Sequence, residues 1–206
     1  MSSIAGVLLA GGLSRRMGGG DKCLRPLGGR PILDHVIERA RPQVGALVLN
    51  ANGDPARFAG HGLPVVADVV PGHAGPLAGV LTGLSWAVED APDAAYVATF
   101  PTDAPFLPRD MVDRCLAAID AAGADMACAA SGGRDHPVAG LWPVALRADL
   151  HHAMTVEDIR KVDIWTARHR LVSVPFDVGS VDPFFNVNRP EDLATAEELL
   201  ARVGGP

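Results

Sequence analysis

Short apolar segments alternate with segments of helical period along the first 130 residues of this 206-residue sequence. Residues 4–10 (IAGVLLA) form a continuous apolar run that ends in glycines, which is typical of a strand buried on both faces. Similar strand-like runs cover residues 46–50, 64–68, 94–100 and 125–130, and segments with one apolar helical face cover 31–44, 76–90 and 108–122. This alternation predicts crossover connections, and therefore an α/β fold with a Rossmann-like, mostly parallel sheet and helices on both faces.

The pattern becomes less regular after Ser131. Residues 136–144 (HPVAGLWPV) predict a strand leading into a short helix, 156–169 and 190–203 predict helices, and 171–176 predicts an edge strand. The sequence shows no internal repeat, low-complexity tract or linker. We therefore expect a single domain over residues 1–206.

Polar or flexible residues follow four of the predicted strands. They are Ala10-Gly11-Gly12, Asn50, Asp68 and Asp103. Ligands of open α/β sheets bind at the carboxyl ends of the strands, so these residues are expected along one edge. Any single Asn or Asp could instead cap a helix or begin a turn. Together with a basic loop that follows the first strand, the set favours a binding site.

That loop, in the segment LLAGGLSRRMGGGDKC, is rich in glycine and positive charge. It matches neither G-x-x-x-x-G-K-[ST], because Lys22 is followed by Cys23, nor G-x-G-x-x-G. Its residues nevertheless suit a triphosphate. Backbone N–H groups of glycine can approach phosphate oxygens closely. Arg15 and Arg16 can hold oxygens in a forked geometry, and Lys22 supplies a compact charge.

Asp103 lies in the segment TFPTDAPFLP, between two prolines that stiffen the loop after an apolar strand. Mg²⁺ usually binds one or two carboxylates and phosphate oxygens, so Asp103 is the candidate metal ligand. The implied chemistry is attack on phosphorus, which proteins catalyse mainly by positioning and charge stabilisation, without a separate nucleophile. Neither G-x-S-x-G nor H-E-x-x-H is present. His136, in a glycine-flanked polar turn, fits a ligand contact and an ordinary turn residue equally well.

The overall charge is acidic, since 18 Lys and Arg residues stand against 24 Asp and Glu residues and give a net charge of −6. We therefore expect no nucleic-acid or membrane-surface partner, because both favour a basic face. Three distant cysteines (Cys23, Cys115 and Cys128) without a C-x-x-C motif indicate a reducing compartment. The segment MSSIAGVLLAGG has no basic leader, and no apolar run is long enough for a membrane span, so we expect a cytoplasmic protein.

Six blocks of the sequence, in order, resemble the molybdenum cofactor guanylyltransferases, which are nucleotidyltransferases with a Rossmann-like fold. LAGGLSRRMGGGDKCLRPLGGRPIL resembles their signature L-A-G-G-x-S-x-R-M-G-x-D-K. The other blocks are VLNAN (48–52), DVVPGHAGPLAGV (68–80), PTDAPFLP (101–108), RDHPVAGLW (134–142) and FFNVNRPEDL (184–193). The resemblance implies transfer of GMP from GTP to the terminal phosphate of molybdenum-molybdopterin, with Mg²⁺ as cofactor and pyrophosphate as the second product.

The resemblance also implies roles on the GTP side. By matching position, the residues that would contact GTP are Leu9, Ala10, Gly11, Gly12, Lys22, Asn50, Asp68 and Asp103. Among them, Leu9, Ala10 and Gly11 would use their backbone. Asn50 and Asp68 would contact the nucleoside, Lys22 would bind the triphosphate, and Asp103 would hold Mg²⁺. Arg15, Arg16 or both would stabilise the departing pyrophosphate, which makes Arg15 a candidate catalytic residue beside Lys22 and Asp103.

On the pterin side, the matching positions are Arg134, Asp135, His136, Asn186 and Asn188. The N-terminal part of the chain would thus mainly bind GTP and the C-terminal part mainly the pterin. Residues 151–171 carry no transferable motif, and their basic pair Arg160-Lys161 fits a solvated helix face better than a pterin-phosphate contact. The implied partners are GTP and molybdenum-molybdopterin, with molybdopterin-insertion proteins and molybdoenzyme chaperones as candidate protein partners.

Three alternatives compete with this interpretation. A cytidylyltransferase acting on the same pterin tends to have L-A-A-G and D-I-D where this sequence has LAGG and NVN. A sugar-1-phosphate nucleotidyltransferase shares the basic glycine loop, but it is commonly longer and a block like FFNVNRPEDL is less expected there. A non-catalytic carrier of the molybdenum cofactor would have little reason to keep Lys22 and Asp103. Mg²⁺-dependent GTP binding with pyrophosphate release would distinguish an enzyme from a carrier.

Overall fold

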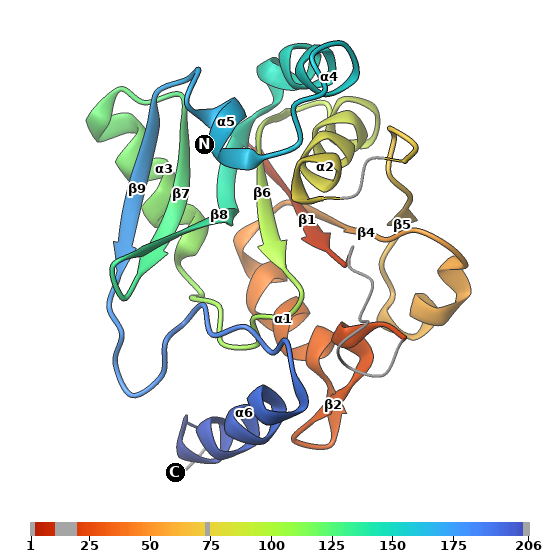
Figure 1. Ribbon diagram of the computed structural model, residues 1–206, viewed down its shortest axis with the longest axis vertical. Helices are drawn as coiled ribbons and strands as arrows, with labels where there is room; N and C mark the ends of the chain where they lie inside the picture. The colour runs from red at the N-terminus through yellow and green to blue at the C-terminus, as the bar shows by residue number, and fades with distance from the viewer. Residues whose placement is uncertain (1–2, 11–19, 73–74, 204–206) are drawn as a thin grey trace.

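The computed structural model describes residues 3–10, 20–72 and 75–203 of the chain. Within these ranges, seven strands form one sheet in the order β5-β4-β1-β6-β8-β7-β9 (Figure 1). They are β1 (Ser3–Leu9), β4 (Ala46–Asn50), β5 (Val65–Val66), β6 (Ala94–Pro101), β7 (Met126–Ser131), β8 (Arg134–Pro143) and β9 (Leu171–Phe176). β8 runs antiparallel to β6 and β7, and all other pairs are parallel. The predicted Rossmann-like, mostly parallel sheet is confirmed.

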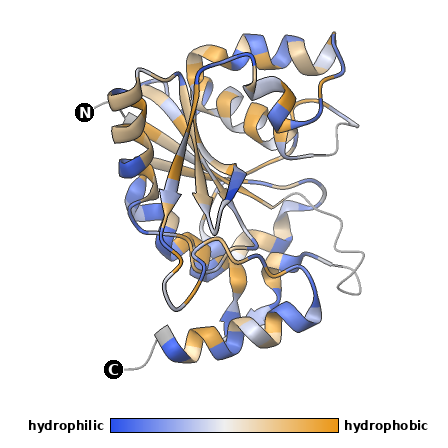
Figure 2. Ribbon diagram, turned by 60° about the vertical axis from the view of Figure 1, so that its left-hand side comes forward, coloured by the Kyte–Doolittle hydropathy of each residue, from blue (hydrophilic) through white to orange (hydrophobic). Residues whose placement is uncertain are grey.

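Helices cover both faces of the sheet and turn their hydrophobic residues toward it (Figure 2). They are α1 (Ile32–Ala40), α2 (Pro76–Asp90), α3 (Met111–Ala122), α4 (Arg147–Thr155) and α5 (Val162–Thr166). A further helix, α6 (Pro190–Val203), packs in a separate core. α1 and α3 share one hydrophobic core with Leu8 of β1, whereas α2, α4 and α5 share another with Val7. Successive strand residues point to opposite faces, so the buried run in β1 serves both cores. In the described ranges, no helix combines the length and the apolar character that a bilayer crossing requires.

The predicted helix over residues 156–169 is wrong. α4 ends at Thr155, residues 156–161 are irregular, and α5 spans only Val162–Thr166. Asp158 has φ of 55°, a left-handed conformation that cannot continue an α-helix. Arg160 pairs with Asp158 at 2.9 Å and Lys161 is exposed, so the basic pair lies on an irregular segment rather than on a helix face.

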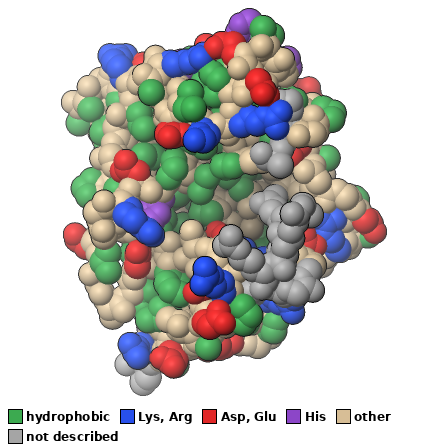
Figure 3. Space-filling model, in the orientation of Figure 1, with side chains coloured by type: hydrophobic (Ala, Val, Ile, Leu, Met, Phe, Trp, Pro, Cys, Tyr) green, Lys and Arg blue, Asp and Glu red, His purple; other side chains and the backbone are tan. Residues whose placement is uncertain are grey.

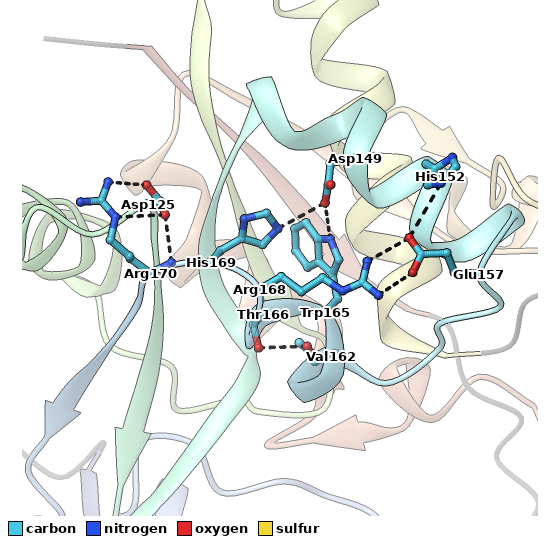
Figure 4. A network of polar contacts seen from close by, with 10 residues as sticks. All are labelled: Asp125, Asp149, His152, Glu157, Val162, Trp165, Thr166, Arg168, His169 and Arg170. Carbon is cyan, nitrogen blue, oxygen red and sulfur yellow. Dashed lines mark hydrogen bonds and ion pairs between the residues drawn. The ribbon is translucent and has the colours of Figure 1, made fainter.

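Polar contacts join α4 to α5, and the irregular segment to the residues that follow α5 (Figure 4). The buried indole of Trp165 donates from Nε1 to Asp149 Oδ2 at 2.7 Å, and Arg168 binds both carboxylate oxygens of Glu157 at 3.0 and 2.6 Å. Trp165 also packs in the core below α2 and α4. Ile159 of the irregular segment is partly buried against the same core.

A third, smaller core attaches α6 to a hairpin of β2 (Pro26–Leu27) and β3 (Arg30–Pro31), at the bottom of Figure 1. Leu27, Phe106, Val187 and Ala196 are buried in it. These residues come from four separate parts of the sequence, and three of them lie within five residues of Lys22, Asp103 or Asn188. Packing of this core therefore brings the three predicted site residues close together.

Candidate active site

The strands β1, β4, β5 and β6 end side by side at the carboxyl edge of the sheet. In the register of the ladders, Leu9 lies opposite Asn50 on one side and Pro101 on the other, and Asn50 lies opposite Val66. The residues that follow these strand ends therefore lie along one edge, as predicted. Figure 3 shows a hollow near the middle of this side of the molecule, with hydrophobic side chains inside and Lys and Arg side chains around it.

Leu9 and Ala10 use part of their backbone within this edge. Ala10 N donates to Asn50 O at 3.0 Å, and Leu9 O accepts a hydrogen bond from Thr102 Oγ1 at 2.9 Å. Their predicted backbone contacts with GTP would therefore rely on the second lone pair of Leu9 O and on the Ala10 carbonyl. The predictions for Gly11, Gly12, Arg15 and Arg16 concern residues outside the described ranges and remain predictions.

Asn50, Asn52 and Asp68 form a hydrogen-bonded group, here called the nucleoside-side cluster, beyond the ends of β4 and β5. Asn50 Nδ2 donates to Asp68 Oδ1 at 3.0 Å, and Asn52 Nδ2 donates to Asp68 Oδ2 at 2.8 Å. Asp68 N donates in return to Asn52 Oδ1 at 2.9 Å. Each carboxylate oxygen of Asp68 thus accepts one amide N–H and keeps acceptor capacity for a further donor. This arrangement can bind N–H or hydroxyl groups of a nucleoside.

Close packing of α2 holds the nucleoside-side cluster in place. Asn50 is 2% exposed, and a Cβ added at Gly79 would lie 2.7 Å from Asn50 Oδ1 and 2.6 Å from Leu9 Cδ2. Both distances are shorter than real Cβ contacts, so a side chain at position 79 must displace a neighbour. The leucine tip can move, whereas Asn50 is fixed by its bonds to Asp68 and to Val66 O at 3.3 Å.

Gly79→Ala is therefore expected to weaken nucleoside triphosphate binding about tenfold by tilting Asn50, even though alanine favours a helix. Binding can be measured by calorimetry and folding by thermal unfolding. Gly60→Ala is the matched control, because a Cβ there meets nothing within 4 Å. Unchanged affinity in Gly79→Ala would show that the close approach of α2 does not set the position of Asn50.

Lys22, Asp103 and Asn188 form a second group, here called the phosphate-side cluster. Lys22 Nζ donates to Asp103 Oδ2 at 2.6 Å and to Asn188 Oδ1 at 2.7 Å. The side chains of Lys22 and Asp103 are 22% and 21% exposed, so the ion pair is only partly screened by water. An ammonium group has three donors, and two bind residues that the structure describes, so a third can serve a phosphate oxygen.

The backbone fixes two members of the phosphate-side cluster. Val187 N donates to Asp103 O at 2.8 Å, which pins the chain just before Asn188. Asp192 Oδ2 then accepts from Asn188 N and from Arg189 N, both at 2.8 Å, and so caps the start of α6. Asn188, predicted for the pterin side, therefore contacts the predicted triphosphate lysine, a contact that its sequence position did not indicate.

Cys23, next to Lys22, is turned into the core. Lys22 begins a short 3₁₀ helix (Lys22–Leu24) in which Cys23 is the buried residue. Burial, reinforced by the nearby Asp21 carboxylate, raises the pKa of the Cys23 thiol to about 11. The thiol is therefore protonated at neutral pH and is no nucleophile. Its burial directs the neighbouring Lys22 side chain outward to the cluster.

The residues present fit a divalent metal that arrives with the triphosphate. The described ranges contain no group of three or more His, Cys, Asp or Glu side chains placed for a metal. Asp103 offers one carboxylate, and its Oδ1 accepts no hydrogen bond from any residue that the structure describes. One carboxylate together with phosphate oxygens and water is a common ligand set for Mg²⁺. Asp103 can therefore hold a metal without losing Lys22.

A further polar group lies at the start of β8, where the pterin-side residues were predicted. Ser131 Oγ is 2.7 Å from both Asp182 Oδ1 and His136 Nε2. Because Ser131 donates its hydrogen to Asp182, His136 Nε2 must be the protonated nitrogen that donates to Ser131. Burial, more than the nearby charges, lowers the pKa of His136, so the ring is neutral near pH 7 and Nδ1 can accept a hydrogen bond. The ring is also stacked on Phe184, with centroids 4.6 Å apart.

The other predicted pterin-side residues are more exposed. Arg134 begins β8 at the surface, and Asn186 is exposed one residue before the pinned Val187. Asp135 Oδ1 accepts from Ser173 Oγ at 2.5 Å, which ties it to the edge strand β9. Arg134 and Asp135 lie at the start of β8, and within the described ranges no hydrogen bond joins Arg134, Asp135 or Asn186 to the phosphate-side cluster. Their predicted roles remain predictions.

Comparisons with known proteins agree with this geometry. The sequence matches the MobA-like NTP transferase domain over residues 6–171. It is 58% identical over 200 residues to a molybdenum cofactor guanylyltransferase of Bradyrhizobium sp. (strain ORS 278), which covers 97% of this chain and 94% of the relative. The chain belongs to the molybdenum cofactor guanylyltransferase family. A second relative of that name, from Rhodopseudomonas palustris (strain BisB5), is 56% identical over 196 residues, covering 95% and 93% of the two chains.

Solved structures support the fold of this family member. Molybdopterin-guanine dinucleotide biosynthesis protein A from Archaeoglobus fulgidus superposes with a TM-score of 0.74 at 20% identity, over 96% of this chain and 99% of the other. A 4-diphosphocytidyl-2C-methyl-D-erythritol synthase from Anaerococcus prevotii superposes with a TM-score of 0.73 at 12% identity, over 98% and 99%. As a guanylyltransferase family member the chain is a nucleotidyltransferase, and the cytidylyltransferase, sugar nucleotidyltransferase and carrier alternatives are not favoured. Enzymes of this kind normally use a divalent metal.

Proposed function

We propose that this chain transfers GMP from GTP to the terminal phosphate of molybdenum-molybdopterin, forming molybdopterin guanine dinucleotide and pyrophosphate. The observation that carries this proposal is the contact of Lys22 with both Asp103 and Asn188. In this contact a cation lies beside a carboxylate that can hold a metal, and two of the three ammonium donors bind residues that the structure describes. The nucleoside-side cluster lies along the same sheet edge, so one nucleoside triphosphate can reach both groups.

In the proposed reaction, an oxygen of the acceptor phosphate attacks the α-phosphorus of GTP. The new P–O bond forms as the bond from the α-phosphorus to the bridging oxygen of the β-phosphate breaks, and pyrophosphate leaves with that electron pair. The acceptor phosphate is already ionised at neutral pH, so no general base is required. Lys22 offsets charge on the triphosphate through its third N–H, and Arg15, with Arg16, is proposed to stabilise the pyrophosphate. Mg²⁺ held by Asp103 would neutralise phosphate charge when bound.

The nucleoside and the pterin are proposed to lie on opposite sides of the phosphate-side cluster. Asn50 and Asp68, with Leu9 and Ala10 beside them, would orient the nucleoside. Arg134, Asp135, His136 and Asn186 would contact the pterin, with His136 Nδ1 as one acceptor for its N–H groups. The N-terminal part of the single domain thus mainly binds GTP and the C-terminal part mainly the pterin.

The recipients of the product and the compartment of the protein are also proposed. The product is a cofactor, so molybdopterin-insertion proteins and molybdoenzyme chaperones are the proposed recipients. A cytoplasmic location is proposed because Cys23, Cys115 and Cys128 are all buried free thiols, as expected in a reducing compartment.

Pyrophosphate release tests the proposed function. With Mg²⁺ and a molybdopterin-loaded acceptor, the purified protein is expected to use GTP with kcat/KM at least about tenfold above that for CTP or ATP. Omitting the acceptor should abolish release, which separates transfer from hydrolysis. A preference for CTP would overturn the base assignment and keep the mechanism. Tight cofactor binding without release from any nucleotide would replace the enzyme by a carrier.

A further inference from the structure

Arg57 makes three hydrogen bonds that link the two sides of the candidate active site. Its Nε donates to Asp21 Oδ2, its Nη2 to Asn52 O and its Nη1 to Asp54 O, each at 2.5 Å. Asp21 directly precedes Lys22 of the phosphate-side cluster, and Asn52 belongs to the nucleoside-side cluster. One guanidinium group therefore joins the segment that carries the triphosphate lysine to the segment that holds Asp68.

The local sequence is built to place this guanidinium. Asp54 and Pro55 begin a 3₁₀ helix (Pro55–His61), in which Asp54 Oδ1 accepts from Ala56 N at 2.9 Å. Gly53 has φ of 86°, a backbone conformation that favours glycine, and a Cβ there would lie 3.2 Å from Arg57 Nη1. The guanidinium also lies over the buried Phe58 ring, 4.6 Å from its centroid.

The planar fork of arginine is what such a link requires. Its donors point in fixed directions, so the Asp21 carboxylate and two carbonyl oxygens of the 52–54 turn are held at fixed relative positions. The Arg57 and Asp21 side chains are 28% and 20% exposed, which limits screening of their ion pair. Asp21 Oδ2 accepts from Arg57 Nε, so this carboxylate anchors the segment that carries Lys22.

We propose that Arg57 is a positioning residue that sets the spacing between the nucleoside-side and phosphate-side clusters. The inference rests on the proposed function, because both clusters must act on one nucleotide. A ligand that spans both clusters is sensitive to the distance between them, since its binding to one cluster becomes intramolecular once it has bound the other. A fragment that occupies only one cluster is not sensitive to that distance. Arg57 therefore matters for intact GTP and not for guanosine or inorganic triphosphate alone.

The test compares these three ligands in wild type, Arg57→Met and Arg57→Lys. Arg57→Met is expected to weaken GTP binding at least about tenfold, a usual effect of removing a residue that orients binding groups. Inhibition constants of guanosine and inorganic triphosphate, measured by competition with a fluorescent GTP analogue, should change less than about twofold, because each cluster stays intact. The GTP affinity of Arg57→Lys should lie between those of wild type and Arg57→Met, because an ammonium group cannot donate to three acceptors in one plane.

Arg109→Met is the matched control, since Arg109 pairs with Glu38 on the surface, away from both clusters. A double-mutant cycle of Arg57→Met with Asp21→Asn should be non-additive for GTP affinity, because both changes break one contact. Unchanged GTP affinity in Arg57→Met, additive effects in the cycle, or equal weakening of GTP and both fragments would each overturn the proposal. Failure of the proposed function is distinguishable, because it would appear as wild-type protein that binds GTP but releases no pyrophosphate.

Discussion

Replacing Asp103 with asparagine is expected to lower kcat for GMP transfer at least about 10³-fold. Asparagine keeps the size of the side chain but has no charge and only one acceptor oxygen. Lys22 needs that oxygen, since its Nζ lies 2.6 Å from Asp103 Oδ2. The amide nitrogen would then face the position proposed for the metal, which it cannot bind. The change therefore removes the metal ligand and leaves the lysine in place.

Folding should be little affected by Asp103→Asn, because the carboxylate is partly exposed and its backbone bond to Val187 N is kept. Thermal unfolding checks this point beside the pyrophosphate assay. Asp93→Asn is the matched control, since Asp93 stands just before β6, at the opposite end of the same strand. Mg²⁺-dependent activity within about tenfold of wild type in Asp103→Asn would exclude Asp103 as the metal ligand.

The fold and the edge that carries the site follow directly from the order of apolar segments. Residues 46–50 and 190–203 were predicted with the bounds of β4 and α6. Once the strands are parallel, their carboxyl ends must meet, so Asn50, Asp68 and Asp103 could be placed together without a structure. Asn52 was missed as a contact residue although it stands two positions after Asn50 in an extended segment, where alternate side chains point the same way.

The sequence between two of the strand-like runs carries a local hairpin signal. Ser131-Gly132-Gly133-Arg134 joins two strand-like runs through two glycines, with φ of 54° and 76°. A two-residue turn with positive φ at both positions makes a tight hairpin, so β8 had to run antiparallel to β7. This hairpin places His136 beside Ser131, where the two side chains bond.

The contacts that assemble the site have no local signal at all. Lys22 meets Asn188 across 166 positions of sequence, and Arg57 meets Asp21 across 36. The first pair depends on how the small core of Leu27, Phe106 and Val187 docks on the main sheet, which no periodicity in the sequence encodes. Residues 156–161 likewise depart from a helical pattern, because Asp158 adopts a left-handed conformation with φ of 55°.

Replacing Lys22 with methionine is expected to lower kcat/KM for GTP about 10²–10³-fold, through both a higher KM and a lower kcat. Methionine keeps an unbranched, flexible stem and removes the charge, so the loss reports the ammonium and not the packing. Lys22→Arg should restore only part of the activity, because a planar fork cannot point at Asp103, Asn188 and a phosphate oxygen as a compact ammonium does.

The Lys22→Met variant should bind free divalent metal more tightly than the wild type does. The positive charge of Lys22 lies 2.6 Å from Asp103 Oδ2 and would repel a cation bound to the same carboxylate. Removing this charge is therefore expected to raise the affinity for Mn²⁺, measured without nucleotide, by about tenfold. The Mn²⁺ affinity measured by calorimetry would then rise while the rate of pyrophosphate release from GTP falls. Simple unfolding would lower both. Arg41→Met, which changes an exposed cation just after α1, should move neither. Weaker metal binding in Lys22→Met would instead show that the lysine organises the metal site and does not compete with it.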